Sequence, residues 1–198
     1  MKKTLFIIIF VCSFLNSFTQ VCPPEGDATR ENKKELNRKK NKDVNIDSLQ
    51  EPEELELRKL LPSVRRKNDR KLWKEGAYVV MEGYLVDFAE QGPESCNCGE
   101  ARVADKNGDV HMFLGLAKNS AKKNCLVIEI TPKFKDMFPD YKEQFLKKKA
   151  KIRVYGYLFY DFPHEKDAFT TCNACTHIWR KTPWEVHPIT AIEIIDTE

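Results

Sequence analysis

The residues best suited to chemistry are cysteines and histidines in a few short stretches of the chain. Cys96 and Cys98 stand one residue apart, and His111 follows them at the start of an apolar segment. His187 lies near the C-terminus. Zinc in proteins prefers thiolate and imidazole ligands, usually four at a time. If the fold brings them together, the sequence predicts a zinc site made of Cys96, Cys98, His111 and His187.

Further polar residues are expected around this set. Asp161 and His164 should lie next to the four ligands, where a carboxylate can orient an imidazole. Cys172, Cys175 and His177 form an additional Cys/His clip in the segment before Trp184.

The same cysteines also permit disulfides. Seven cysteines are present, and removal of an export signal that contains Cys12 would leave an even number. Cys96 and Cys98 could pair with Cys172 and Cys175, and the two histidines could be half-buried strand residues that bind carbonyl groups. Zinc, disulfides and free thiols all stay open at this point.

The first residues resemble an export signal. Lys2 and Lys3 precede an apolar run that is too short to span a bilayer as a helix, and polar residues follow it. We therefore predict a signal peptide over residues 1–20, a periplasmic or secreted protein, and no transmembrane segment in the mature chain. A lipid anchor on Cys22 is disfavoured, because Val21 occupies a position where a small residue is expected.

The formal net charge of +3 is too small to indicate a nucleic-acid partner by itself. Basic residues are clustered, however, and most such runs are solvated surface. Aromatic residues on the predicted strands could stack on bases or sugars. The predicted ligand-binding residues are Lys149, Lys151, Arg153, Arg180 and Trp184.

Composition divides the chain into four parts. Residues 21–45 carry almost no large apolar side chain, which predicts a flexible basic arm. Residues 46–75 should form a short helix, started by a capping box at Ser48, and then a basic linker. Residues 76–198 form the folded domain.

Five segments in this domain have the composition of β-strands. A single amphipathic helix is expected over residues 139–149, between the third and fourth of them. This order predicts a mostly β protein with a five-stranded OB-fold barrel, and a generic small α+β sheet is the alternative. The strands are expected at residues 78–88, 109–116, 125–131, 152–160 and from Val186 onward.

In an OB-fold, the loop between strands one and two (L12) lies beside the loop between strands four and five (L45), and both frame the ligand face. The first loop here carries the Cys96/Cys98 pair, and the second carries Asp161 to Trp184. The cysteines and histidines should therefore converge at one end of the barrel.

Several of these elements also resemble a known family. The segments Glu94-Ser95-Cys96-Asn97-Cys98, Asp109-Val110-His111 and Trp184-Glu185-Val186-His187-Pro188 are similar to ESCNC, DxH and WEIHP elements. Such elements recur in a poorly characterised family of exported bacterial single-OB-fold proteins. The resemblance covers residues 75–195, and residues 36–42 resemble a recurring upstream element. Residues 166–182 are an insertion relative to the family pattern.

This family has no established activity, so the resemblance implies fold and export and leaves function open. We predict a binding module with a Cys/His-lined site, whose candidate ligands are single-stranded nucleic acid, an oligosaccharide or another protein. The alternative is a metal-dependent hydrolase, resembling a phosphodiesterase or nuclease, that uses the same cluster. Possible zinc is the only cofactor expected.

Overall fold

The structure is a computed structural model that describes residues 22–42, 51–66, 69–99 and 108–196. The expected export signal and the capping box at Ser48 lie outside the described residues. Within the described ranges, no helix has the length and apolar character needed to cross a membrane.

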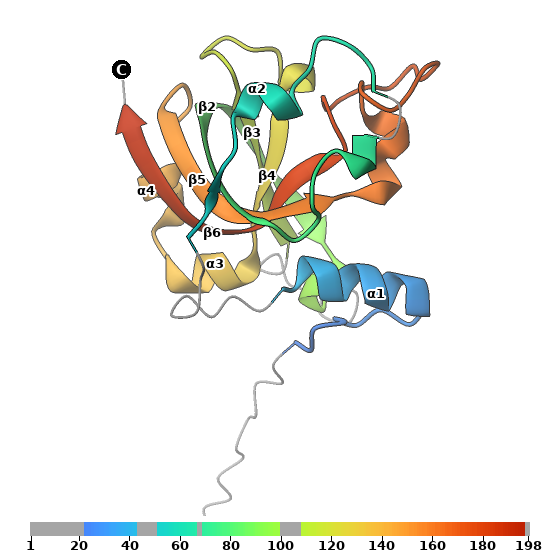
Figure 1. Cartoon of the computed structure of the whole chain (residues 1–198). Helices are drawn as coiled ribbons and strands as arrows, with labels where there is room; N and C mark the ends of the chain where they lie inside the picture. The colour runs from blue at the N-terminus through green and yellow to red at the C-terminus, as the bar shows by residue number, and fades with distance from the viewer. Residues whose placement is uncertain (1–21, 43–50, 67–68, 100–107, 197–198) are drawn as a thin grey trace, which may run out of the picture.

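The protein is mostly β, as predicted, and all five expected strands are present (Figure 1). Each apolar segment forms a strand close to its expected bounds because β-branched and aromatic side chains suit a pleated surface. The strands are β2 (Tyr78–Pro93), β3 (Gly108–Gly115), β4 (Leu126–Ile130), β5 (Lys151–Tyr160) and β6 (Trp184–Asp196).

The expected count of five strands is wrong, because a sixth strand joins the sheet. The two-residue strand β1 (Glu53–Glu54) pairs in parallel with Val79 and Val80 of β2. The following helix α2 (Leu57–Leu60) is much shorter than the helix expected here, and it buries Leu57 and Leu60. Packing of these leucines against the sheet favours an extended approach to α2 over a longer helix.

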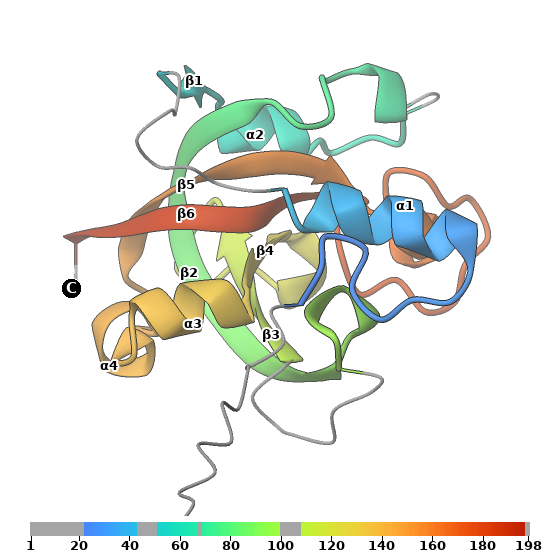
Figure 2. The same cartoon turned by 90° about the horizontal axis from the view of Figure 1, so that it is seen from below.

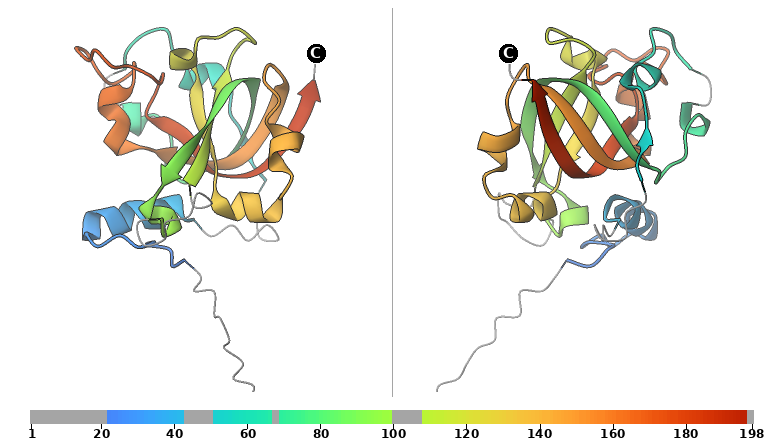
Figure 3. Two further views of the ribbon diagram at one scale, coloured as in Figure 1. Left: turned by 180° about the vertical axis from the view of Figure 1, so that it is seen from behind. Right: turned by 60° about the vertical axis from the view of Figure 1, so that its left-hand side comes forward.

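The sheet closes on itself. Its strand order is β1-β2-β3-β4-β6-β5, and β2 also pairs with β5. All pairs in the closed part are antiparallel except β4 with β6, which is parallel. Figure 3 shows these strands wrapped around a common interior.

Alternation along the strands gives the sheet two different faces. Val110, Met112 and Ile128 point into the main hydrophobic core. Because successive side chains point to opposite sides, His111 and Glu129 lie on the outer face of the same strands. The outer face of β3, β4 and β6 therefore carries the polar residues Asp109, His111, Glu129, Glu185 and His187.

The single helix expected over residues 139–149 is replaced by two short ones, α3 (Pro132–Met137) and α4 (Tyr141–Phe145). The hydroxyl of Thr131 accepts a hydrogen bond from the Phe134 amide, which starts α3 before the expected position. Pro139 then disfavours helical backbone at the residue before it, which separates the two helices.

The prediction of a flexible arm over residues 21–45 is also wrong for its described part, residues 22–42. Residues 31–40 form helix α1 (Glu31–Lys40), which lies against one end of the closed sheet (Figures 1 and 2). Polar contacts hold it there: Asn37 donates to Ser95 Oγ at 3.2 Å, and Asn41 donates to the Cys96 carbonyl at 2.5 Å. A Cys22–Cys98 disulfide adds a covalent tether. A segment poor in apolar residues is thus ordered by hydrogen bonds and a cross-link.

Substitution of Gly83 in β2 tests how tightly the closed sheet is packed. A Cβ atom at this position would lie 2.7 Å from side-chain atoms of Leu57 and Leu114 and 3.0 Å from the Gly115 carbonyl oxygen. We expect Gly83→Ala to lower the free energy of unfolding by about 1–3 kcal/mol, measured by urea denaturation. Gly92→Ala is the control, because a Cβ there meets nothing within 4 Å. Equal stability of the two variants would contradict this packing.

The Cys22–Cys98 disulfide should contribute strongly to stability, because it closes a long loop with a sequence separation of 76. Loop-closure entropy predicts a loss of about 4 kcal/mol for the Cys22→Ser/Cys98→Ser double variant. The Cys172–Cys175 bridge, with a separation of 3, should contribute only about 2 kcal/mol. Chemical denaturation measures both losses, and hydrogen exchange should show faster exchange of α1 amides in the first variant only.

Candidate functional site

Glu129 is the centre of the polar cluster on the outer face of the sheet. His111 Nε2 lies 2.8 Å from one carboxylate oxygen, and His187 Nδ1 lies 2.5 Å from the other. The strands explain this geometry, because His111 pairs directly opposite Glu129, and Val186 beside His187 pairs with Ile128. Three adjacent strands thus place two imidazoles on one buried carboxylate.

Lys40 at the end of α1 reaches into the same cluster. Its Nζ lies 3.1 Å from Glu94 and 3.7 Å from Glu129, and its side chain is only 11% exposed. Burial alone would lower the pKa of the ammonium, but the carboxylates of Glu129, Glu94 and Glu185 outweigh it and raise that pKa well above its usual range. Lys40 is therefore a fixed positive charge.

The charge on Glu129 is fixed in the same way. Burial would raise the pKa of this carboxyl, but Lys40, His187 and His111 hold it well below its usual range. Glu129 therefore stays ionised although its side chain is only 2% exposed.

Asp109, at the start of β3, completes the cluster. Asn97 donates a 2.8 Å hydrogen bond to its Oδ1, whereas its buried Oδ2 has no hydrogen-bond partner among the described residues. Burial, and then the charges of Glu129 and Glu94, raise the pKa of Asp109 well above its usual range.

Two overlapping groups of side chains in this cluster could hold a metal ion. Ligand atoms of Asp109, Glu129 and His187 all lie within 4.8 Å of one another. Glu94, Cys96 and Asp109 form a similar group. The first group consists of two carboxylates and an imidazole, all buried.

A second buried ion cluster adjoins the first. The Arg180 guanidinium donates to Asp161 at 2.8 Å and to Glu185 at 2.9 Å, and it also binds the Thr182 carbonyl. Arg180 is 1% exposed and Glu185 is completely buried. This cluster ties the segment after β5 to the start of β6.

A pocket of about 660 Å³ opens above Glu129 and His111. It lies between the outer face of β3 and β4, helix α1, the loop after β2 and the segment after β5. Trp179 forms part of its wall and stacks on His111 with ring centroids 6.2 Å apart. The charged and imidazole-bearing residues that line it are Lys33, Lys40, Glu94, His111, Lys122, Glu129, Asp161 and His164.

The four predicted zinc ligands do not form one coordination set. Cys98 is in the disulfide with Cys22, so its sulfur cannot act as a thiolate. Cys96 is a buried free thiol that donates to Glu94, and burial raises its pKa well above its usual range. His111 and His187 do converge, as expected, but they meet on Glu129.

The additional clip and the predicted cross-loop disulfides are also corrected. Cys172 pairs with Cys175, three residues away, rather than with Cys96 or Cys98. His177 is exposed and does not line the pocket. Because Cys172 and Cys175 are only three residues apart, they form a disulfide within one segment, and this bridge does not link the loop after β2 to the segment after β5.

Asp161 and His164 lie where they were expected, in the wall of the same pocket as His111. Their closest ionic partners, however, are Asp167 and Arg180 rather than His111 or His187. His164 Nδ1 lies 2.7 Å from Asp167, and Asp161 binds Arg180.

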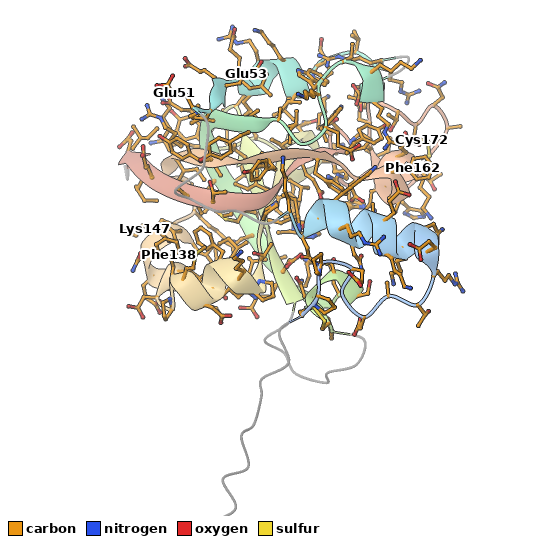
Figure 4. All side chains as sticks on the ribbon, turned by 60° about the horizontal axis from the view of Figure 1, so that its bottom comes forward. Glu51, Glu53, Phe138, Lys147, Phe162 and Cys172 are labelled. Carbon is orange, nitrogen blue, oxygen red and sulfur yellow. A yellow bond between two sulfur atoms is a disulfide. The ribbon has the colours of Figure 1, made fainter. Side chains whose placement is uncertain are left out.

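The predicted ligand-binding residues fall into two groups, neither of which lines the pocket. Arg180 and Trp184 are almost fully buried. Lys151 and Arg153 form ion pairs with Glu82. Lys149 lies just before β5. In Figure 4 the labelled Lys147, two residues earlier, and the labelled Phe162 lie on opposite sides of the view, and the neighbours of Phe162 in sequence, Asp161 and Pro163, line the pocket.

Three residues of the cluster were not among the predicted site residues: Lys40, Asp109 and Glu129. Glu129 could have been found from the sequence, because it is the single charged residue in the apolar segment Leu126–Ile130. All residues of this strand are buried, so a charge there needs partners. Asp109 stands in the DxH element, two residues before His111 and hence on the same face. Lys40 lies in the upstream element at residues 36–42, which composition alone assigned to a flexible arm.

No protein-family model matches this sequence, and no curated protein matches it either. Among solved structures, asparaginyl-tRNA synthetase from Entamoeba histolytica in complex with asparaginyl-adenylate is similar at a TM-score of 0.37 and 14% identity. That similarity covers 74% of this chain and only 24% of the synthetase. The OBody AM3L15 bound to hen egg-white lysozyme has a TM-score of 0.39 and 11% identity, over 63% of this chain and 85% of that one.

Glu185 makes stability depend on pH in a defined direction. Burial, followed by the charges of Glu129 and Asp161, raises the pKa of Glu185 well above its usual 4.5, although Arg180 partly opposes this. A carboxyl with a raised folded-state pKa stabilises the fold below its unfolded-state pKa, and this contribution is lost as pH rises through the folded-state pKa.

We therefore expect wild type to lose stability relative to Glu185→Gln as pH rises from about 5 to 8, measured by urea denaturation in EDTA-containing buffers. Glu193→Gln, on the same strand but with an exposed side chain, should show the pH dependence of wild type. If the free energy of unfolding changes with pH in the same way for wild type and Glu185→Gln, Glu185 is not the source of the pH dependence.

Proposed function

We propose that this protein is an OB-fold binding module whose ligand occupies the pocket above Glu129. The closed part of the sheet supports the fold assignment. Its order, β2-β3-β4-β6-β5 with β2 returning to β5, places the third and fifth long strands side by side in parallel. Helices α3 and α4 lie between the third and fourth long strands, where an OB-fold has its helix.

The position of the pocket carries the functional proposal. OB-folds bind ligands on the face of strands two and three, between L12 and L45. Here those strands are β3 and β4, and the pocket lies on their outer face. Glu94 from the loop after β2 and His164 from the segment after β5 both line it.

The charges around the pocket favour an uncharged, hydroxyl-rich ligand such as an oligosaccharide. Three lysines (Lys33, Lys40 and Lys122) face three carboxylates (Glu94, Glu129 and Asp161), so the lining offers donors and acceptors without a strong net field. Sugar hydroxyls can use both kinds of group. A nucleic acid would need an excess of positive charge.

The basic residues elsewhere give little support to a polyanion ligand. Arg153 is shared between Glu82 and Glu193, and Lys151 also pairs with Glu82. Arg180 is buried against Asp161 and Glu185. Single-stranded nucleic acid and a protein partner are therefore the less favoured ligands.

We also propose that the protein is exported. The export-signal composition of residues 1–20 supports this, and so do the two disulfides, since such bonds persist mainly in oxidising compartments. Pairing of Cys22 with Cys98 also argues against lipidation of Cys22.

The alternative of a metal-dependent hydrolase loses its original basis. It required Cys96, Cys98, His111 and His187 to hold the metal, and Cys98 is disulfide-bonded. With that ligand set lost, the hydrolase stays the less favoured alternative, and turnover that depends on a metal ion would be needed to support it.

His164 and His177 provide a matched test of the binding pocket. His164 is 40% exposed in the pocket wall, whereas His177 is exposed outside it. With an array of short neutral oligosaccharides as the probe, we expect His164→Ala to weaken binding of the best glycan about tenfold, the effect of losing one to two hydrogen bonds. His177→Ala should bind like wild type, and calorimetry can measure all three.

Salt dependence separates the alternatives. Oligosaccharide binding should change little between low and physiological salt, because few ions are released. Binding of single-stranded oligonucleotides that weakens steeply with salt, together with no glycan binding, would contradict the proposal. Cleavage of a phosphodiester that depends on an added divalent ion would favour the hydrolase.

A further inference from the structure

The polar cluster brings three acidic side chains together in a largely buried site. The ammonium of Lys40 lies 3.1 Å from Glu94 and 3.7 Å from Glu129. Asp109 shares one candidate ligand group with Glu94 and another with Glu129. Uncompensated buried charge is costly, so such sites are normally completed by protons or metal ions.

The unused ligand atoms show where a cation would lie. Asp109 is fully buried, and its Oδ2 has no hydrogen-bond partner among the described residues. Asp109 belongs to both candidate ligand groups, and in the first its ligand atom lies within 4.8 Å of those of Glu129 and His187. This buried oxygen makes no hydrogen bond among the described residues, so it is available to a cation.

We propose that Asp109, Glu129 and His187 bind one divalent cation beside Lys40. The positive charge of the metal would offset the charge of these buried acidic groups. Two carboxylate oxygens and one imidazole nitrogen are ligands that zinc accepts, at about 2.0–2.2 Å. His111 Nε2, 2.8 Å from Glu129, is placed to orient that carboxylate.

Strand geometry makes this set rigid. Its members come from the three adjacent strands β3, β4 and β6, held in register by ladder hydrogen bonds. This proposal does not depend on the oligosaccharide ligand, because metal binding is measured without any glycan.

The first experiment titrates the oxidised wild-type protein with Zn²⁺ after treatment with a chelator and its removal. We expect saturable binding of one equivalent by calorimetry. The absence of saturable binding overturns the proposal.

Asp109→Asn and Asp161→Asn provide a matched pair of buried variants. Asparagine at position 109 keeps the shape of the side chain but removes its charge, and we expect Zn²⁺ affinity to fall at least about tenfold. Asp161 binds Arg180 and is outside the ligand group, so Asp161→Asn should change the affinity less than about threefold. Equal affinities of wild type and Asp109→Asn would overturn the assignment, and circular dichroism checks that each variant is folded.

Lys40→Met tests the position of the site independently. The ammonium repels a nearby metal ion, so its removal should tighten Zn²⁺ binding about tenfold or more. Weaker or unchanged binding by folded Lys40→Met would place the metal elsewhere.

Cobalt substitution identifies the ligand type. A site of oxygen and imidazole ligands gives a visible spectrum without an intense sulfur-to-cobalt charge-transfer band. The appearance of that band would assign Cys96 as a ligand and overturn the proposed set.

Discussion

The outer face of the closed sheet depends on one buried carboxylate, that of Glu129. It lies in β4 between β3 and β6, and both neighbouring strands supply an imidazole to it. An ionised carboxylate without partners in such a place would cost several kcal/mol. The positions of His111, His187 and Lys40 follow from this requirement.

The same requirement explains the N-terminal segment. Helix α1 has little apolar surface with which to dock, yet it must bring an ammonium to Glu129. Asn37 and Asn41 bind it to the loop after β2, and the Cys22–Cys98 bridge limits its separation from that loop. The helix is therefore placed by specific polar contacts, and hydrophobic burial contributes little.

Two elements outside the sheet turn its outer face into a pocket. Helix α1 covers one side, and the segment between β5 and β6 covers the other, with Trp179 stacked on His111. Arg180 anchors this segment through its buried pairs with Asp161 and Glu185. Because Glu129 belongs both to the floor of this pocket and to the proposed cation site, ligand binding and cation binding share one carboxylate.

Sequence alone determined the strands, because period-two alternation and β-branched residues favour extended backbone through local interactions. It also determined that His111 and His187 converge, since that follows from strand order. Only the tertiary structure decided which groups pair. The Cys22–Cys98 bridge, the docking of Lys40 and the role of Glu129 join residues far apart in the chain, and each partner taken alone resembles ordinary surface or core. Such pairings arise from the free-energy cost of burying charge, which depends on what covers a residue and not on its neighbours in sequence.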